Sequence, residues 1–287
     1  MKTVYIGSSE FSLRVLSAAV ARLAPALVVT RPPAARGRGR HVASTPVADG
    51  ARELGLTVLE PTRLGDVAEE IAAIEPDLVV LCAYGGIVRE PLLSRHEILN
   101  IHPSLLPRWR GAAPVERTIM AGDAESGISL MRLVEELDAG PVCRVQAIAV
   151  EPDDDYGALS GRLADLAAAM LVEALDGPRD YVEQGVAGIT YAEKLTAVDR
   201  ELDPHRAAAE LERQVRALHP HVGARLSGGL GVLEARLASR PTPAGDLATQ
   251  DGRLYYGAAP GTLELLRVQP PGGRAMDAAS YLRGHGV

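Results

Sequence analysis

The first third of the chain alternates short apolar segments with amphipathic ones, and this alternation limits the possible folds more than any other feature. Segment 3–7 has the apolar character of a buried strand, segment 10–23 repeats apolar residues at helical spacing, and segment 26–30 is a second expected strand. Strands that are separated by helices run parallel within one sheet. We therefore expect an α/β fold with a doubly wound, mostly parallel sheet of the Rossmann-like type.

The alternation continues to residue 83. Helices are expected over residues 47–54 and 66–74, and strands over residues 58–59 and 77–83. Ligands of such sheets bind at the carboxyl ends of the parallel strands. Polar residues that follow an expected strand are therefore the first candidates for a functional site.

Residues 31–46, RPPAARGRGRHVASTP, interrupt the alternation with a strongly basic segment. The segment contains four arginines, and its prolines and glycines predict a long, mobile loop without regular structure. Composition leaves two interpretations open, a disordered surface connection and an arm that contacts the phosphates of a nucleic acid.

The chain changes character near residue 190. Polar residues there follow a helical stretch at 155–175 and precede an expected helix at 204–218. Farther on, short strand-like segments are separated by Gly and Pro, as in a small barrel: 231–237, 252–257 and 262–268. We predict a catalytic domain over 1–189, a linker over 190–202 and a C-terminal domain over 203–287.

Charge and cysteine content exclude several classes of protein. The formal net charge of -7 argues against nonspecific nucleic-acid binding over the whole surface, although residues 203–287 carry ten Arg against eight acidic residues. Cys82 and Cys143 are too few for a disulfide framework, and no metal-binding spacing of Cys and His is present. No segment approaches the ~20 apolar residues of a membrane span. We expect a cytoplasmic protein that uses neither a membrane nor a metal.

Candidate catalytic residues lie in the stretch 99–114, LNIHPSLLPRWRGAAP. The period of two along a strand places Asn100 and His102 on one face, and Pro103 ends the strand. A carboxamide N–H and a protonated imidazole can stabilise the negative charge that develops on a carbonyl oxygen when an amine attacks the carbon. The pair therefore suits acyl transfer.

Asp138 is the candidate carboxylate. It lies in Leu137-Asp138-Ala139-Gly140, an expected tight loop between the apolar run 128–133 and the strand-like segment 142–150. A carboxylate near the imidazole would orient it and favour its charged form, and could receive the proton that the attacking amine loses. Each of the three residues, taken singly, also has an ordinary structural explanation as a turn residue or a satisfied polar group.

Together these motifs resemble the signature of the folate-dependent formyltransferases, in particular of the branch that acts on methionyl-tRNA. NIHPSLLPRWRGAAP is followed by MAGDAESGISLM and then by LDAG. The resemblance extends to RGRGR in the basic segment, AYGGIV at 83–88, TYAEKL at 190–195 and GTLELLRVQPPGGRAM near the C-terminus. Nearly the entire chain is covered.

The resemblance implies that 10-formyltetrahydrofolate is the formyl donor, as a co-substrate, and that the amino group of methionyl initiator tRNA is the acceptor, in translation initiation. It assigns catalysis to Asn100, His102 and Asp138. The folate contacts that it implies are Ser104, Leu105, Leu106, Pro107, Tyr84, Gly85 and Leu137.

The resemblance also gives the basic segment a role, because the corresponding loop of the family enters the acceptor-stem region of the tRNA. It implies tRNA contacts by Arg38, with Arg36 and Arg40 assisting. The C-terminal domain of the family is a small OB-like barrel with a basic face directed at the tRNA, which implies the same for residues 203–287 here. A monomer is expected.

The chain departs from the family pattern at a few positions, and other functions stay open. The catalytic loop has Glu136, Ala139 and Pro141 at positions that are often Gly, Thr and Asp, and the C-terminal domain is somewhat short. The main alternative is a formyltransferase for another amine, such as an amino sugar nucleotide or glycinamide ribonucleotide. A nucleotide-binding oxidoreductase is disfavoured because Gly7-Ser8-Ser9-Glu10 lacks the GxGxxG spacing, and a non-catalytic RNA-binding protein would leave the three candidate residues without a purpose.

Overall fold

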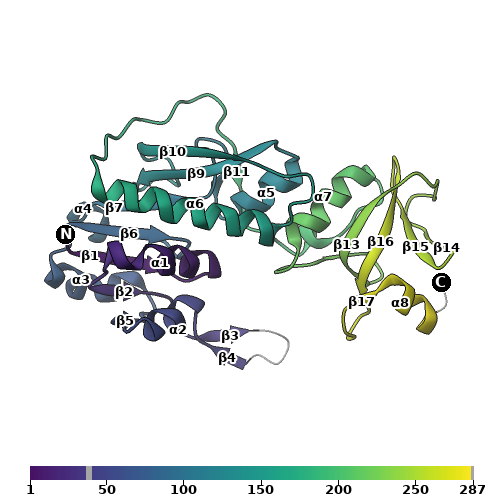
Figure 1. Cartoon of the computed structure of the whole chain (residues 1–287), viewed down its shortest axis with the longest axis horizontal. Helices are drawn as coiled ribbons and strands as arrows, with labels where there is room; N and C mark the ends of the chain where they lie inside the picture. The colour runs from purple at the N-terminus through teal and green to yellow at the C-terminus, as the bar shows by residue number, and fades with distance from the viewer. Residues whose placement is uncertain (37–40, 286–287) are drawn as a thin grey trace. The chain divides into compact units, whose positions relative to one another are not determined.

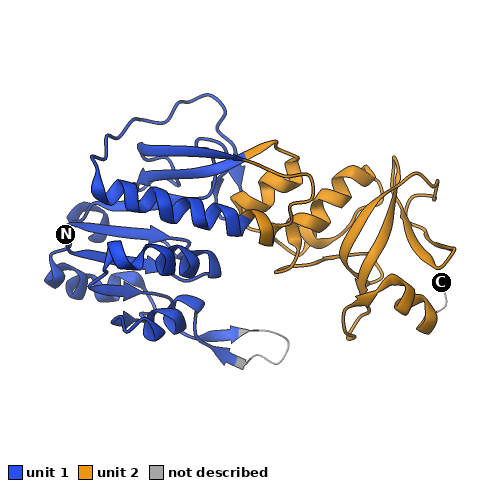
Figure 2. Ribbon diagram, viewed as in Figure 1, with its two compact units in different colours: residues 1–112, 126–148, 160–192 blue, residues 113–125, 149–159, 193–287 orange. Residues whose placement is uncertain are grey.

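The computed structural model describes residues 1–36 and 41–285, which form two compact units, coloured blue and orange in Figure 2. The first unit comprises residues 1–112, 126–148 and 160–192, and the second comprises residues 113–125, 149–159 and 193–287. Residues 113–125 and 149–159 therefore belong to the same compact unit as the C-terminal part of the chain. The predicted boundaries along the chain, 1–189, 190–202 and 203–287, stay a prediction.

Seven strands form the sheet of the first unit, in the order β10-β9-β7-β6-β1-β2-β5 (Figure 1). The strands β5, β2, β1, β6 and β7 pair in parallel, whereas β9 runs antiparallel to β7. Their bounds are Thr3–Gly7 (β1), Leu27–Val29 (β2), Val58–Leu59 (β5), Leu78–Cys82 (β6), Ile98–His102 (β7), Glu125–Arg132 (β9) and Val142–Ala149 (β10). The predicted mostly parallel α/β fold is confirmed.

Helices pack on both faces of this sheet, which explains why its central strands are apolar without alternation. Val4 and Ile6 lie in one apolar cluster with Ile71, whereas the hydroxyl of Tyr5, between them, donates to the backbone oxygen of Ser12 on the opposite face. The helices of the first unit are Glu10–Leu23 (α1), Pro46–Glu53 (α2), Leu64–Val67 (η1), Ala68–Ile74 (α3), Leu92–Arg95 (α4) and, for most of its length, Tyr156–Asp176 (α6).

The basic segment contains regular structure, contrary to the expectation from its composition. Strands Ala34–Arg36 (β3) and His41–Ala43 (β4) pair antiparallel, with Ala34 opposite Ala43. Pro32 and Pro33 precede β3 and therefore do not interrupt it, since a proline removes a ladder donor only at its own position. The expectation of a loop without regular structure was wrong for these strands.

The second unit is rich in β-structure. Its larger sheet has the order β12-β13-β16-β15-β14, and β17 pairs with β16. Its strands are Ala224–Arg225 (β12), Gly231–Ala238 (β13), Leu247–Gln250 (β14), Arg253–Gly257 (β15), Thr262–Gln269 (β16) and Met276–Asp277 (β17). This confirms the prediction of a C-terminal domain built from short strands.

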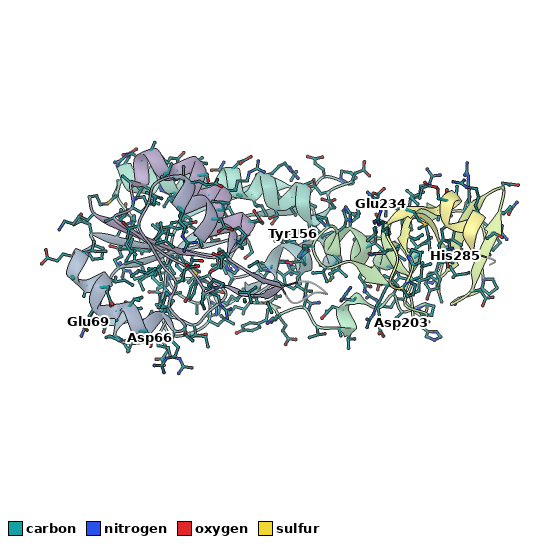
Figure 3. The ribbon with its side chains drawn as sticks, turned by 90° about the horizontal axis from the view of Figure 1, so that it is seen from below. Asp66, Glu69, Tyr156, Asp203, Glu234 and His285 are labelled. Atoms are coloured by element: carbon teal, nitrogen blue, oxygen red, sulfur yellow. The ribbon has the colours of Figure 1, made fainter. Side chains whose placement is uncertain are left out.

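Four helical elements accompany this sheet: Pro114–Ala121 (α5), Val198–Arg200 (η2), Ala208–Leu218 (α7) and Ala278–Gly284 (α8). Leu211 and Leu218 of α7 are fully buried against Val232 and Leu263 in one core. Tyr156, labelled in Figure 3, stacks on His221 with ring centroids 3.7 Å apart, and His221 Nε2 lies 2.9 Å from the buried carboxylate of Glu116. The second unit therefore has its own apolar core and a polar cluster formed by Tyr156, His221 and Glu116.

Every helix within residues 1–36 and 41–285 is too short or too polar to span a membrane. In the same part of the chain, no group of three or more His, Cys, Asp and Glu side chains is arranged to hold a metal ion.

Candidate active site

Strand β7 carries two of the predicted catalytic side chains to the carboxyl edge of the sheet. Asn100 lies opposite Met131 of β9 and beside Leu81 of β6, and His102 is the last residue of the strand. Both side chains are buried, with exposed fractions of 7% for Asn100 and 4% for His102. The period of two that the sequence predicted places both on the same face of β7.

The loop between β9 and β10 brings Asp138 to the same place. The backbone amide of Gly111 donates to Asp138 Oδ2 at 2.8 Å, Asn100 Nδ2 lies 3.4 Å from Oδ1, and His102 Nδ1 lies 3.6 Å from Oδ2. Asp138 is itself only 8% exposed. The structure therefore brings the three predicted side chains together, although they are up to 38 residues apart in the sequence.

The second ring nitrogen of His102 faces a backbone carbonyl. His102 Nε2 lies 2.8 Å from the carbonyl oxygen of Trp109, so this nitrogen donates. Trp109 adopts a left-handed backbone conformation with φ of 63°, which is uncommon for a residue with a side chain. Both ring nitrogens thus face acceptors, and the ring is held in one orientation.

The contacts among Asn100, His102 and Asp138, which we call the trio, are longer than ordinary hydrogen bonds. At separations of 3.4 Å and 3.6 Å, the carboxylate makes no short hydrogen bond with the amide of Asn100 or with Nδ1 of His102. Hydrogen bonds of catalytic groups are often long before the substrate arrives. The arrangement can offer two donors to a developing oxyanion and one carboxylate to a departing proton.

The predicted folate segment Ser104, Leu105, Leu106 and Pro107 forms the loop that follows β7. The hydroxyl of Ser104 is buried and donates to the carbonyl of Arg108 at 2.6 Å. Ser129 Oγ of β9 donates to the carbonyl of Ser104 and accepts from the amide of Leu106. These bonds shape the loop, and they occupy the Ser104 hydroxyl within the protein.

The three remaining predicted folate contacts lie on two loops of the first unit. Tyr84 is only 5% exposed and packs in an apolar core cluster, whereas Leu137 is 58% exposed. Gly85 has φ of 71°, and its carbonyl accepts from Arg31 Nη1 at 2.9 Å. Leu137 directly precedes Asp138 in the chain, and its exposed side chain is available to a ligand. The Tyr84 ring lies mostly inside the core.

The predicted tRNA contacts are described only in part. Arg38 and Arg40 lie outside the described residues. Arg36 is the last residue of β3, and its backbone pairs with His41 of β4. Their role in binding stays a prediction.

Two residues that sequence reasoning missed support the site from residues 182–192. Gln184 contacts the loop of Asp138, and Thr190 contacts Trp109. Thr190 begins the motif TYAEKL, which resembles the family, but the resemblance assigned no role to this residue. Gln184 lies in a polar stretch that carries no pattern of its own.

Comparisons with known proteins extend over both parts of the chain. The family described as Formyl transferase matches residues 1–175, and the one described as Formyl transferase, C-terminal domain, matches residues 194–286. The methionyl-tRNA formyltransferase of Halorhodospira halophila is 43% identical over 297 residues, which cover 99% of this chain and 96% of that protein.

Solved structures share the fold at low sequence identity. HypX from Aquifex aeolicus in complex with tetrahydrofolic acid matches with a TM-score of 0.67 and 17% identity, over 98% of this chain and 47% of HypX. The chain thus spans about half the length of HypX. The N-formyltransferase from Helicobacter canadensis, in complex with folinic acid and dTDP-3-aminofucose, matches with a TM-score of 0.70 and 12% identity, over 92% of this chain and 98% of that one.

Proposed function

Because this chain belongs to the formyl transferase family, we propose that it transfers the formyl group of 10-formyltetrahydrofolate to the amino group of methionyl initiator tRNA. The observation that carries the proposal is the convergence of Asn100, His102 and Asp138 at the carboxyl end of β7. The acceptor follows from a full-length relative that is named for methionyl-tRNA. The proposal includes a cytoplasmic location, a monomer and a reaction without a metal.

The loops around the trio have the character that a folate co-substrate requires. Leu137 and Ile87 are large apolar side chains that are 58% and 73% exposed on the loops that precede β10 and follow β6. Exposed apolar side chains beside a polar site suit a ligand that combines a flat ring with polar edges. Leu137, with backbone groups near Gly85 and the 104–107 loop, would hold the folate, which supplies the activated formyl group.

The residues of the trio divide the chemistry. The amide of Asn100 and the ring of His102 donate hydrogen bonds to the formyl oxygen as negative charge develops on it. Asp138, whose Oδ2 is already oriented by the amide of Gly111, accepts the proton that the attacking amine loses. Because all three side chains are buried, the charge develops away from bulk water, where each donor has a larger effect.

Two basic regions suit a tRNA acceptor. Residues 36–40 contain Arg36, Arg38 and Arg40, and residues 203–287 carry ten Arg against eight acidic residues within a chain of net charge -7. Locally concentrated arginines bind phosphates even on a protein that is acidic overall. We therefore assign the tRNA contacts to these regions.

Another amine acceptor is the second candidate. The Helicobacter canadensis enzyme, whose structure contains dTDP-3-aminofucose, shares the fold, but at 12% identity the likeness supports the fold alone. Relatives that are 40–43% identical over nearly the whole chain and are named for methionyl-tRNA favour tRNA over a small acceptor.

The proposal is tested by transfer of labelled formyl from 10-formyltetrahydrofolate to charged initiator tRNA. Elongator methionyl-tRNA and a panel of amino sugar nucleotides serve as competing acceptors. Selective labelling of the initiator tRNA is expected. Labelling of a small amine alone would overturn the acceptor and keep the chemistry, whereas absence of transfer to every acceptor would overturn both.

A further inference from the structure

Residues 182–192 cross the first unit as an irregular segment that is fixed at its two ends. Figure 1 shows the long coil that leads from α6 toward β11, Tyr191–Ala192. At its start, Val182 and Val142 of β10 exchange backbone hydrogen bonds of 2.8 Å and 2.9 Å. At its end, β11 pairs in parallel with Arg110–Gly111 (β8), the strand that carries the amide donor to Asp138. We refer to residues 182–192 as the strap.

Gln184 of the strap holds the catalytic loop by its backbone. Its Nε2 donates to the carbonyl oxygens of Asp138 and Gly140, each at 2.8 Å. The buried guanidinium of Arg110 donates to Gln184 Oε1 from Nη2 at 2.8 Å and from Nε at 3.1 Å. Because Arg110 can only donate, Oε1 must face it, and the amide nitrogen must face the two carbonyls. All polar atoms of the Gln184 amide are therefore committed.

The Asp138 loop needs such a support. Asp138 has φ of 46°, a left-handed conformation that costs energy for a residue with a side chain. Gly140 packs so closely that a Cβ there would lie 1.9 Å from the carbonyl oxygen of Arg132. The two hydrogen bonds from Gln184 bracket this turn, so they fix the backbone from which the Asp138 carboxylate projects.

Thr190 supports the other side of the site. Its Oγ1 accepts from the amide of Trp109 at 2.9 Å, and its carbonyl accepts from the amide of Arg110 at 2.9 Å. Trp109 is the residue in the left-handed conformation whose carbonyl accepts from His102 Nε2. The Thr190 hydroxyl thus stabilises the backbone that orients the imidazole.

We propose that Gln184 and Thr190 are positioning residues for formyl transfer: Gln184 sets the place of the Asp138 carboxylate, and Thr190 sets the orientation of the His102 ring. The inference rests on the proposed function of the same site. Neither residue donates to the carboxylate or the ring directly. A misplacement of about 1 Å in a reacting group can lower the rate by as much as about 100-fold. Loss of either support is therefore expected to lower kcat and to leave substrate affinity nearly unchanged.

Gln184→Glu tests the first half of the proposal. The variant keeps the acceptor for Arg110 but replaces the two amide donors by an oxygen that repels the carbonyls of Asp138 and Gly140. We expect kcat to fall by about 10- to 100-fold, with KM for folate and for tRNA close to the wild-type values. Gln146→Glu, the same change at an exposed position of β10, is the matched control and is expected to keep wild-type kcat.

Thr190→Val and Thr190→Ser test the second half. Valine keeps the shape of threonine and loses the hydroxyl, whereas serine keeps the hydroxyl. We expect a lower kcat in Thr190→Val and rescue in Thr190→Ser. Equal losses in both variants would overturn the role of the hydroxyl.

Amide hydrogen exchange gives a readout that does not depend on any acceptor. The Gly111 amide donates to Asp138 Oδ2, so it reports on the carboxylate, and the Trp109 amide reports on Thr190. Faster exchange at Gly111 in Gln184→Glu and at Trp109 in Thr190→Val, with unchanged melting temperature, is the expected result.

Unchanged exchange and kcat in both variants would overturn the proposal, as would a fall in kcat that is matched by a general loss of stability. If the wild-type protein transfers formyl to no acceptor, the proposed function fails. The exchange measurement still decides whether the strap holds Asp138 and Trp109 in place.

Discussion

Asp138 combines a demanding backbone conformation with a buried charge. Its φ of 46° is tolerated because Asp and Asn enter the left-handed region more readily than other residues with a side chain. Its carboxylate accepts from Gly111 and faces Asn100 and His102. The residue type at this position is therefore limited first by the backbone and then by the chemistry.

Asp138→Asn separates these two requirements. Asparagine keeps the size and the left-handed conformation but removes the negative charge and the proton acceptor, so kcat is expected to fall by at least about 100-fold with little change in melting temperature. Asp251→Asn is a matched control, because Asp251 is exposed and also has a positive φ, of 51°. Near-normal turnover in Asp138→Asn would remove Asp138 from the mechanism.

His102→Ala tests the second member of the trio. The variant loses a donor to the developing oxyanion, so turnover is expected to fall by about 100- to 1,000-fold, with little loss of folate affinity. Turnover under saturating substrates and folate binding by titration are the two measurements. His205→Ala, at an exposed position of the second unit, should behave like the wild type. A large loss of folate affinity with normal turnover would contradict the assignment.

Among the secondary-structure elements, β7 is anchored just before its first residue. Glu97 Oε1 accepts from Arg179 Nε at 2.9 Å and from the Tyr181 hydroxyl at 2.7 Å. Partial burial raises the pKa of the Glu97 carboxyl, but the hydrogen bonds from Arg179 and Tyr181 outweigh it and hold the pKa below its usual value. This network links the start of β7 to residues that lead into the strap.

Glu97→Gln should therefore destabilise the protein in a pH-dependent way. A carboxyl with a lowered pKa in the folded state contributes stability above its unfolded pKa of about 4.3, and this contribution is lost as the pH falls through the folded value. The difference in unfolding free energy between the wild type and Glu97→Gln is expected to be largest near pH 7 and to shrink below about pH 4. Urea unfolding at both pH values measures it, and Glu70→Gln, an exposed change on α3, is the control. A difference that does not vary with pH would argue against the ion-pair explanation.

The segment between β3 and β4 carries the predicted tRNA contact Arg38. Arg38→Ala removes one phosphate-directed charge, so tRNA binding should weaken and the slope of log affinity against log salt should decrease by about 1. Binding measured over a series of salt concentrations checks this. Arg63→Ala, which removes an exposed arginine at the start of η1, should leave the slope unchanged. The same slope in both variants would place the tRNA contact elsewhere.

The chain forms two units with separate apolar cores. The candidate catalytic residues lie in the first unit, and the C-terminal strands lie in the second. Leu263 is fully buried in the core of the second unit. Leu263→Ala is expected to lower the unfolding free energy of that unit by about 2–5 kcal/mol. In a urea series, tRNA binding should then be lost at a lower urea concentration than folate binding, because the proposed folate contacts lie in the first unit.

Leu237→Ala is the control for this prediction. Leu237 lies in the same unit on β13, but it is 57% exposed, so its truncation should change stability little. Simultaneous loss of tRNA and folate binding in Leu263→Ala would show that the two units unfold together.

The sequence by itself determined the mostly parallel sheet, because the apolar strands and amphipathic helices follow patterns that are local in the chain. It also placed Asn100 and His102 on one face, since period two is a property of any strand. The sequence did not predict β3 and β4, because the Pro and Gly residues of the basic segment suggested a loop. The two strands are formed by the residues that lie between those prolines and glycines.

Only the tertiary structure decided which distant groups support the trio. Gln184 lies 46 residues from Asp138, and Thr190 lies 81 residues from Trp109, and nothing local relates them. Such contacts depend on how an irregular segment returns across the sheet, and on hydrogen bonds to backbone groups that any residue carries. Local patterns therefore supplied the candidate catalytic side chains. Only the tertiary structure supplied the groups that support them, because a backbone acceptor has no signature in the sequence.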